Sequence, residues 1–176
     1  MAQTKLHNYS VQEKLNKMDV DLIDVAMTTD ADATGEVLAL VTEIPNAVSV
    51  KGGTAILQSA VWMCNKVVTG SVDIVITSDS GTLKEDDGGT VDLGLTDNVQ
   101  ATALVTTAGV MDGTCGHFEI NNSFDAGAVS IGSKQNIGMV CKAEADSTSL
   151  YVWMISRNAT DYAEDTGVLR LGFVKD

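Results

Sequence analysis

Apolar and polar residues alternate along much of this chain, and this alternation predicts β-strands. In the segment 169–173, the side chains of Leu169, Leu171 and Phe173 fall on one face, because successive side chains of a strand point to opposite faces. Ser71–Thr77 is rich in β-branched residues and is bounded by glycine and serine turns, which is a second strong strand signal. The dominant period is therefore that of a sheet.

Similar patterns predict about eight to ten strands in all, separated by turn residues. Besides Ser71–Thr77, they are Leu22–Met27, Glu36–Ile44, a short strand at 48–50, Thr54–Lys66, Ala103–Thr107, His117–Ile120, Gln135–Ala143, Thr148–Ser156 and Val168–Val174. No internal repeat and no second domain are evident. We predict an all-β, mainly antiparallel chain that folds as a single-domain β-sandwich, jelly roll or barrel.

A short helix is expected ahead of the strands. Ser10 and Glu13 form a capping-box pattern, in which each side chain satisfies a free backbone N–H. Apolar residues then recur at helical spacing: Val11, Leu15 and Met18. We predict an arm and short helix within residues 1–20 and a β-domain over 21–176. Because two helical turns are marginal alone in water, this helix must pack on its own β-domain or on a neighbour.

Charge narrows the range of partners. The net charge is −13, from 11 basic and 24 acidic residues. Nucleic-acid binding needs clustered Lys and Arg, and an anionic membrane surface would repel the chain. We expect neither partner. The acidity favours solubility, with attraction to a basic partner surface or a cation as the alternative.

The cysteines indicate a reducing compartment. Cys64, Cys115 and Cys141 are odd in number and form no C-x-x-C pair, which argues against a disulfide framework. Cys64 and Cys141 sit in apolar runs and are predicted to be packed thiols. Cys115 lies in a glycine-rich segment that we expect to be a loop. The first residues carry no apolar core of a signal peptide.

Candidate catalytic chemistry is sparse. By residue type, Cys115 and His117 suggest a nucleophile and a base. Residues two apart in a strand point the same way, so the two side chains would share a face. The sequence offers no orienting acid and no oxyanion hole for them. Neither His117 nor His7 has zinc-ligand spacing. We therefore expect no enzyme activity, no catalytic residue and no cofactor.

The best cation candidate is the acidic turn that contains Asp30, Asp32 and Glu36. These residues resemble the first half of a calcium-binding loop. The twelfth loop position is Val41, where a bidentate Glu is required, so a plain acidic turn is the expectation. Trp62 and Trp153 lie among apolar neighbours in predicted strands, which favours the core or a subunit contact over an exposed sugar platform.

Three segments resemble small β-rich virion proteins of tailed bacteriophages. They are Ile44–Lys66, Ser71–Leu83, and the region from Ile137 to the closing strand Leu169–Phe173. The resemblance implies a capsid decoration or cement protein on the surface of a phage head, made in the host cytoplasm. It also implies the major capsid protein as partner and a homo-oligomer, either a dimer or a trimer. It supplies no catalytic residue.

Within this interpretation, the predicted arm and helix are the expected partner contact. The contact residues would be Leu6, Val11, Leu15 and Met18. Packing of the helix on its own β-domain remains the alternative. A second functional interpretation is a receptor- or glycan-binding β-module of a phage head or tail fibre, for which exposed Trp and Tyr side chains would form a groove.

Overall fold

The computed structural model describes residues 20–29, 37–65, 70–78, 83–84, 90–91, 113–125, 129–157 and 165–175. These residues form strands β1 Val20–Thr29, β2 Val37–Ile44, β3 Thr54–Cys64, β4 Ser71–Thr77, β5 Leu83–Lys84, β6 Thr90–Val91, β7 Thr114–Asp125, β8 Ser130–Lys142, β9 Leu150–Ser156 and β10 Asp165–Lys175. Within this part of the chain there is no helix. The all-β prediction is confirmed, whereas the arm, the helix and the strand at 103–107 lie outside the described residues.

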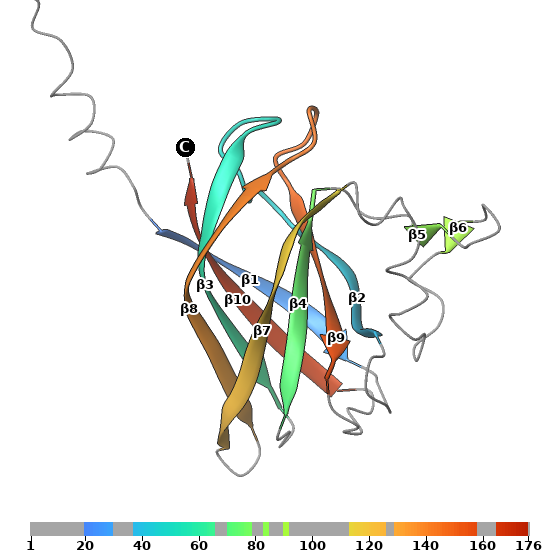
Figure 1. Ribbon diagram of the computed structural model, residues 1–176, viewed down its shortest axis with the longest axis vertical. Coiled ribbons are helices and arrows are strands. Elements are labelled where there is room, and N and C mark those ends of the chain that lie inside the picture. Colours follow the sequence, from blue (N-terminus) through green and yellow to red (C-terminus); the bar gives the residue numbers. More distant parts are fainter. Residues whose placement is uncertain are drawn as a thin grey trace, which may run out of the picture.

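Eight strands form one antiparallel sheet in the order β1-β10-β3-β8-β7-β4-β9-β2. Four of its ladders are nested in sequence: β4 pairs with β7, β3 with β8, β2 with β9 and β1 with β10. Because this nested set of ladders is curled over, β10 also pairs with β3, and β4 also pairs with β9. The result is the strand order of a jelly roll, and Figure 1 shows the strands wrapped around one interior.

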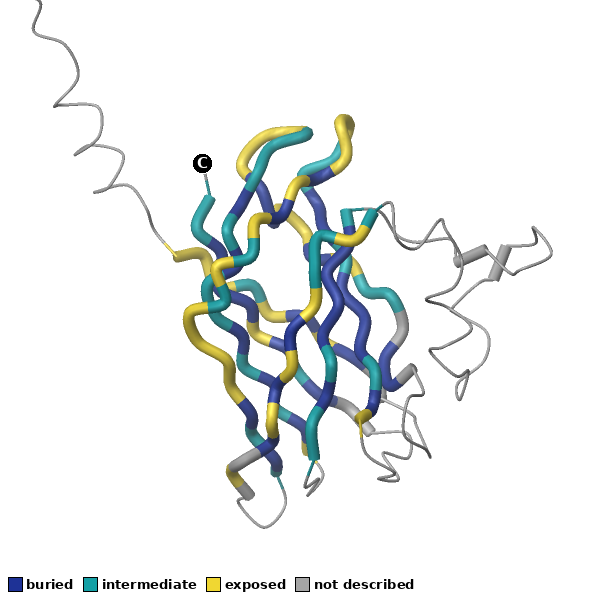
Figure 2. Tube along the Cα trace, in the orientation of Figure 1, coloured by how far each residue is buried: buried dark blue, intermediate teal, exposed yellow. Residues whose placement is uncertain are grey.

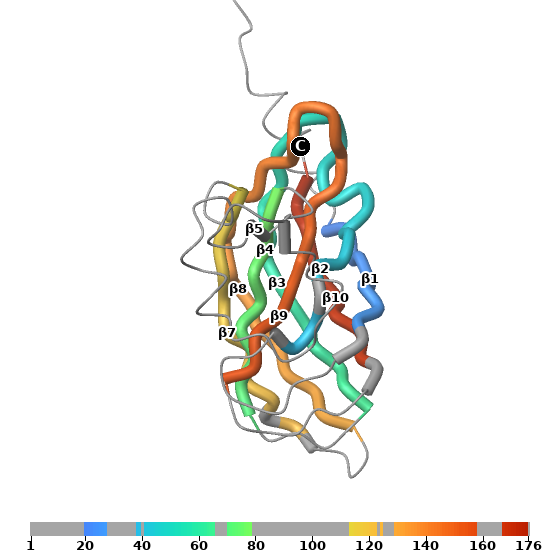
Figure 3. The backbone as a smooth tube through the Cα atoms, turned by 90° about the vertical axis from the view of Figure 1, so that its right-hand side faces the viewer, coloured from blue at the N-terminus to red at the C-terminus, as the bar shows by residue number. Residues whose placement is uncertain are grey.

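The sheet bends between β8 and β7 into two facing halves. These two strands pair only over a short stretch, from Asn122↔Gly132 to Asp125↔Ser130. Beyond it, β7 stays with β4 and β8 stays with β3. On the opposite side, the end strands β1 and β2 approach within 8 Å between Cα atoms. The side view in Figure 3 shows this curl.

The inward faces of both halves form one core. Leu169, Leu171 and Phe173 are fully buried, as the alternation predicts. The largest fully buried side chains come from six strands of the sheet, β2, β3, β4, β7, β9 and β10: Trp62, Phe173, Leu38, Ile44, Leu57, Ile74, Ile76, Ile120, Leu150, Met154 and Leu169. Figure 2 shows buried and exposed positions alternating along the strands. Each such side chain stabilises the fold by roughly 1.5–3 kcal/mol.

Trp62 is wholly buried and requires a glycine across the ladder. On β10, a Cβ added to Gly167 would lie 2.1 Å from Cη2 of the Trp62 indole. The indole therefore occupies the space that any larger residue at 167 would need. This close fit fixes how β3 and β10 pack at that end of the sheet.

The short strand predicted at 48–50 is wrong. Residues 45–53 form turns and bends, with positive φ at Asn46 (53°) and Gly52 (67°). The N–H of Val48 donates to the Thr148 carbonyl at 3.1 Å, and that of Gly53 to the Val50 carbonyl at 2.9 Å. One long-range hydrogen bond and one local turn hydrogen bond thus replace a ladder there. The loop expected around Cys115 is also wrong, because Cys115 lies within β7.

Replacing Gly167 with Ala should destabilise the fold. Overpacking of a tight core costs about 1–3 kcal/mol, which corresponds to a drop in Tm of roughly 3–10 °C for a chain of this size. The matched control is Gly116→Ala, whose new methyl group would meet the flexible end of Met139 at 2.9 Å. Thermal denaturation measures both. Equal Tm values for the two variants would contradict the proposed Trp62–Gly167 fit.

Candidate functional site

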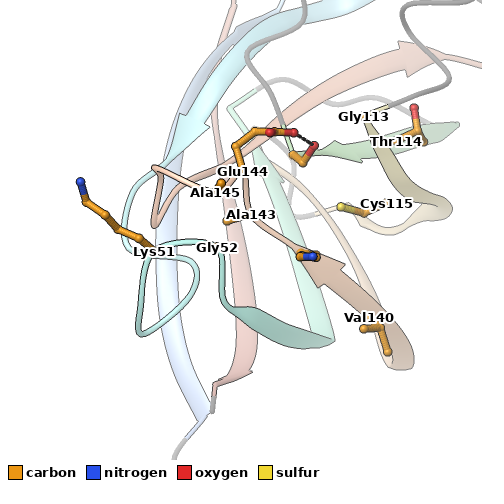
Figure 4. A pocket seen from close by; sticks show the side chains of 11 residues that line it. Lys51, Gly52, Gly113, Thr114, Cys115, Val140, Ala143, Glu144 and Ala145 are labelled. Atoms are coloured by element: carbon orange, nitrogen blue, oxygen red, sulfur yellow. Dashed lines mark hydrogen bonds between the residues drawn. The ribbon is translucent and has the colours of Figure 1, made fainter.

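A cavity of about 700 Å³ opens at the end of the jelly roll where β7 and β8 have separated. Its walls come from the turn before β3, the adjoining ends of β4 and β7, and the last residues of β8 with the turn that follows. Lining residues include Lys51, Ser78, Cys115, Val140, Lys142 and Glu144. Figure 4 shows these side chains around the opening. We call this space the Cys115 cavity.

A β-bulge turns Cys115 toward the core. Along the β4–β7 ladder, Ile76 pairs with Gly116 but Thr77 pairs with Thr114, so Cys115 is the extra residue. Bulges re-aim side chains in this way. Cys115 is half-buried and packs against the core cluster, whereas His117 is exposed. The shared face expected for Cys115 and His117 is therefore not present, and His117 is not placed as a base for this thiol.

A second irregularity brings β8 to the same place. Its ladder with β3 shifts between Leu57↔Met139 and Ser59↔Gln135, so β8 has two more residues than β3 over this stretch. Within this stretch, Asn136 and Gly138 have positive φ angles of 57° and 66°. Asn and Gly are the residues that tolerate such angles best. After the shift, Cys141 returns to the inside and is fully buried opposite Ala55.

The two irregularities bring Cys115 and Cys141 close enough for each thiol to affect the pKa of the other. The hydrogen bond from Cys141, helped by the backbone N–H of Lys142, lowers the pKa of Cys115 to about 7, although burial opposes this change. The same contact, together with burial, raises the pKa of Cys141. Cys115 is thus the acidic member of the pair and the one that reaches the cavity.

The rim of the cavity is held by polar contacts. The Ser78 hydroxyl donates to Oε1 of Glu144 at 2.9 Å, and the Ser78 N–H donates to the Gly113 carbonyl at 2.7 Å. The first bond joins the end of β4 to the turn after β8, and the second joins it to the residue before β7. Lys51 and Lys142 add positive charge at the rim, and Figure 4 shows Lys51 extending outward.

The structure places the other predicted residues as follows. Trp62 and Trp153 are buried, as predicted, and so are Cys64 and Cys141. Asp30, Asp32 and Glu36 lie outside the described residues. The predicted contact residues lie outside them too: Leu6, Val11, Leu15 and Met18. Among the residues that are described, no group of three His, Cys, Asp or Glu side chains is placed to hold a metal ion.

A second feature is the outer face of β1-β10-β3-β8, which carries apolar rows that run across the strands. We define the Val20 row as four residues paired in register: Val20, Val174, Ile56 and Val140. We define the Ala26 row in the same way: Ala26, Val168, Met63 and Ile131. Val20 and Val140 are 49% and 64% exposed, and Leu22 on the same face is 63% exposed.

An ion pair lies between the two rows. Arg170 donates from Nε and Nη2 to the two carboxylate oxygens of Asp24 at 2.7 and 2.9 Å. These residues face each other across the β1–β10 ladder. The guanidinium holds the pKa of Asp24 below its usual value. The outer face therefore combines apolar side chains with a charge pair whose members satisfy each other.

Comparisons with known proteins give fold-level similarities only. No protein-family model matches the chain, and no curated protein matches it. The chain is similar in structure to a protein in the capsid of Ralstonia phage GP4, with 20% identity, a TM-score of 0.44, and coverage of 90% of this chain and 85% of that one.

Two further solved structures are more distant. One is the acidic stable capsid of Helicobacter pylori bacteriophage KHP30, with 12% identity, a TM-score of 0.32, and coverage of 89% of this chain and 87% of that one. The other is tomato aspermy virus, with 6% identity, a TM-score of 0.35, and coverage of 100% of this chain and 83% of that one. In the described part of this chain, no helix has the length and apolar character to cross a membrane.

Alkylation of Cys115 by iodoacetamide should depend on pH with a midpoint near pH 7, because the thiolate is the reactive form and its pKa is about 7. A Cys141→Ala variant removes the hydrogen bond that favours this thiolate, so the midpoint should move upward. A Cys64→Ala control should keep the original midpoint. Mass spectrometry of the Cys115 peptide measures the rates. One common midpoint for all three proteins would contradict the role of the thiol contact.

Proposed function

We propose that this protein is a structural component of a phage virion, and that it acts as a decoration or cement protein on the outside of the head. It binds the major capsid protein, assembles as a dimer or trimer, and is made in the host cytoplasm. Its mechanism is adhesion: by bridging neighbouring shell subunits, it raises the force needed to part them. The proposal assigns it no catalytic step and no cofactor.

The observation that carries this proposal is the apolar outer face of β1-β10-β3-β8. Large exposed apolar patches mark interaction surfaces on soluble proteins. Here Val20, Leu22 and Val140 are each about half exposed or more, on a chain with a net charge of −13. Charge repulsion between acidic surfaces works against random association, so an apolar face of this kind indicates a specific partner surface.

The sequence resemblance described above supports the same function. Two of its three segments, Ile44–Lys66 and the region from Ile137 to Phe173, supply β3, the second part of β8 and most of β10, which belong to the outer face. The resemblance and the apolar face thus concern the same strands. A partner surface built on paired strands is rigid, which suits a protein that holds a shell together.

In the part of the chain that the structure describes, the glycan-binding alternative lacks the feature that would favour it. It requires exposed aromatic side chains that form a groove. Trp62 and Trp153 are 0% and 3% exposed, and Tyr151 is only partly exposed. Among the described residues, Phe124 is the large aromatic side chain that is exposed, at 59%. A single phenylalanine makes no sugar platform.

Replacing Leu22 with Asp should weaken binding to undecorated phage heads by about tenfold or more, because a buried leucine contributes roughly 1.5–3 kcal/mol and a charge would take its place. Val50→Asp is the control, since Val50 is exposed to a similar degree (62% against 63% for Leu22) but lies in a turn. Co-sedimentation with heads measures binding. Equal binding by both variants would contradict the outer face as the contact.

Deleting residues 1–18 should leave the β-domain folded but weaken its assembly or its hold on the head, if Leu6, Val11, Leu15 and Met18 contact a neighbour. Nine extended residues reach at most about 30 Å, enough to touch an adjacent subunit. Co-sedimentation and the Tm are measured together. Full binding by the truncated protein would remove this role from the arm, and loss of folding would place the segment in the protein's own core.

A further inference from the structure

The two cysteines at the Cys115 cavity belong to different halves of the fold. Cys115 lies on β7, where that strand pairs with β4, and Cys141 lies on β8, where that strand pairs with β3. No ladder joins β7 and β8 at this level, because their pairing ends at Asn122↔Gly132. The contact between these thiols therefore bridges a place where the two half-sheets have no backbone hydrogen bonds between them.

The surrounding contacts confirm that the strands are close here. A Cβ added to Gly116 would lie 2.9 Å from Cε of Met139, so β7 and β8 touch through side chains one or two residues from the thiols. Within β8, the Cys141 thiol donates to the Met139 carbonyl oxygen at 3.8 Å. Both cysteines are thiols in the structure. Each thiol affects the pKa of the other, which makes Cys141 the thiol that can react with a modified Cys115.

Access from solvent is unequal. Cys115 lines the cavity and is half-buried, whereas Cys141 is fully buried. A cavity of about 700 Å³ lies within the range of about 300–1,000 Å³ typical of small-molecule sites. Lys51 and Lys142 at the rim offset the acidity of the chain for an anionic reagent. A small reagent can therefore reach Cys115 first, and Cys141 only through Cys115.

We propose that Cys115 is a thiol-modification site for low-molecular-weight disulfides of the glutathione class, and that Cys141 then closes a Cys115–Cys141 disulfide between the two half-sheets. The lowered pKa of Cys115 favours the thiolate that begins this exchange. The proposal concerns the chemistry of the fold and does not depend on the proposed virion function.

The reaction proceeds in two exchanges. The Cys115 thiolate attacks one sulfur of the small disulfide, which forms a mixed disulfide and releases one thiolate that takes up a proton from water. Cys141 then loses its proton and attacks the Cys115 sulfur, which releases the second small thiolate. In total the two cysteine thiols lose two electrons and two protons, and the small disulfide is reduced to two thiols.

The test is to incubate the full chain with oxidised glutathione, and then to record the intact mass and the disulfide-linked peptides. The native chain should lose two hydrogens, carry no glutathione, and show a linked Cys115–Cys141 peptide. Its Tm should rise by roughly 5–10 °C, because a disulfide across a loop of this length constrains the unfolded chain. Reduction should reverse both changes.

Three variants separate the steps. Cys141→Ala should stop at a stable glutathione adduct on Cys115, Cys115→Ala should not react, and Cys64→Ala should behave like the native chain. Peptide mapping of the native chain gives the same information if a variant fails to fold. A stable adduct on the native chain would overturn the closure by Cys141. Absence of any reaction at Cys115, or reaction at Cys64 in its place, would overturn the site itself.

Discussion

The fold depends on the register of its eight paired strands, which keeps the apolar core side chains of every strand on the same side of the sheet. Because side chains alternate with a period of two, a slip by one residue would move a whole apolar set from the core to solvent. The ladders keep Leu57, Ile74 and Leu171 on the inside of their strands, so the two half-sheets enclose one core. The bulge at Cys115 lies at the start of β7, so the alternation of the rest of that strand is kept.

Much of this alternation could be predicted from the sequence, because burial on one face leaves a local signal. Ser71–Thr77 was predicted with the bounds that β4 has, and the burial of Leu169, Leu171 and Phe173 followed from their spacing. Val48 and Val50 gave the same local signal, but the strand predicted there was wrong. The hydrogen bond from Val48 to Thr148 that holds this segment is a long-range contact. Propensity alone carries no information about such a partner.

The Cys115 cavity was missed for a related reason. The contact between Cys115 and Cys141 requires two register shifts, one on each strand. The sequence of neither segment alone determines the register between distant strands. Asn136 and Gly138 were the available signal, since both tolerate positive φ and stand close together in a predicted strand. The rows on the outer face were missed likewise, because Val20, Val174, Ile56 and Val140 become neighbours only through three ladders.

The ion pair on the outer face bears on how that face can be covered. Burying a lone charge is costly, whereas a paired and hydrogen-bonded charge is far easier to bury. Arg170 and Asp24 meet through two hydrogen bonds, so a partner that covers the rows needs no countercharge of its own for them. The face can therefore be matched by a mostly apolar surface.

The nested pairing also constrains when the chain can fold during synthesis. In the sheet, β10 stands between β1 and β3, yet it is translated after all the other strands. Until it emerges from the ribosome, β1 has no ladder partner and β3 has one open edge, and open edges invite pairing with other chains. Sheets built on such distant contacts fold slowly, in milliseconds to seconds. The ladder between β4 and β7 can form earlier, but the jelly roll closes only once β10 has been synthesised.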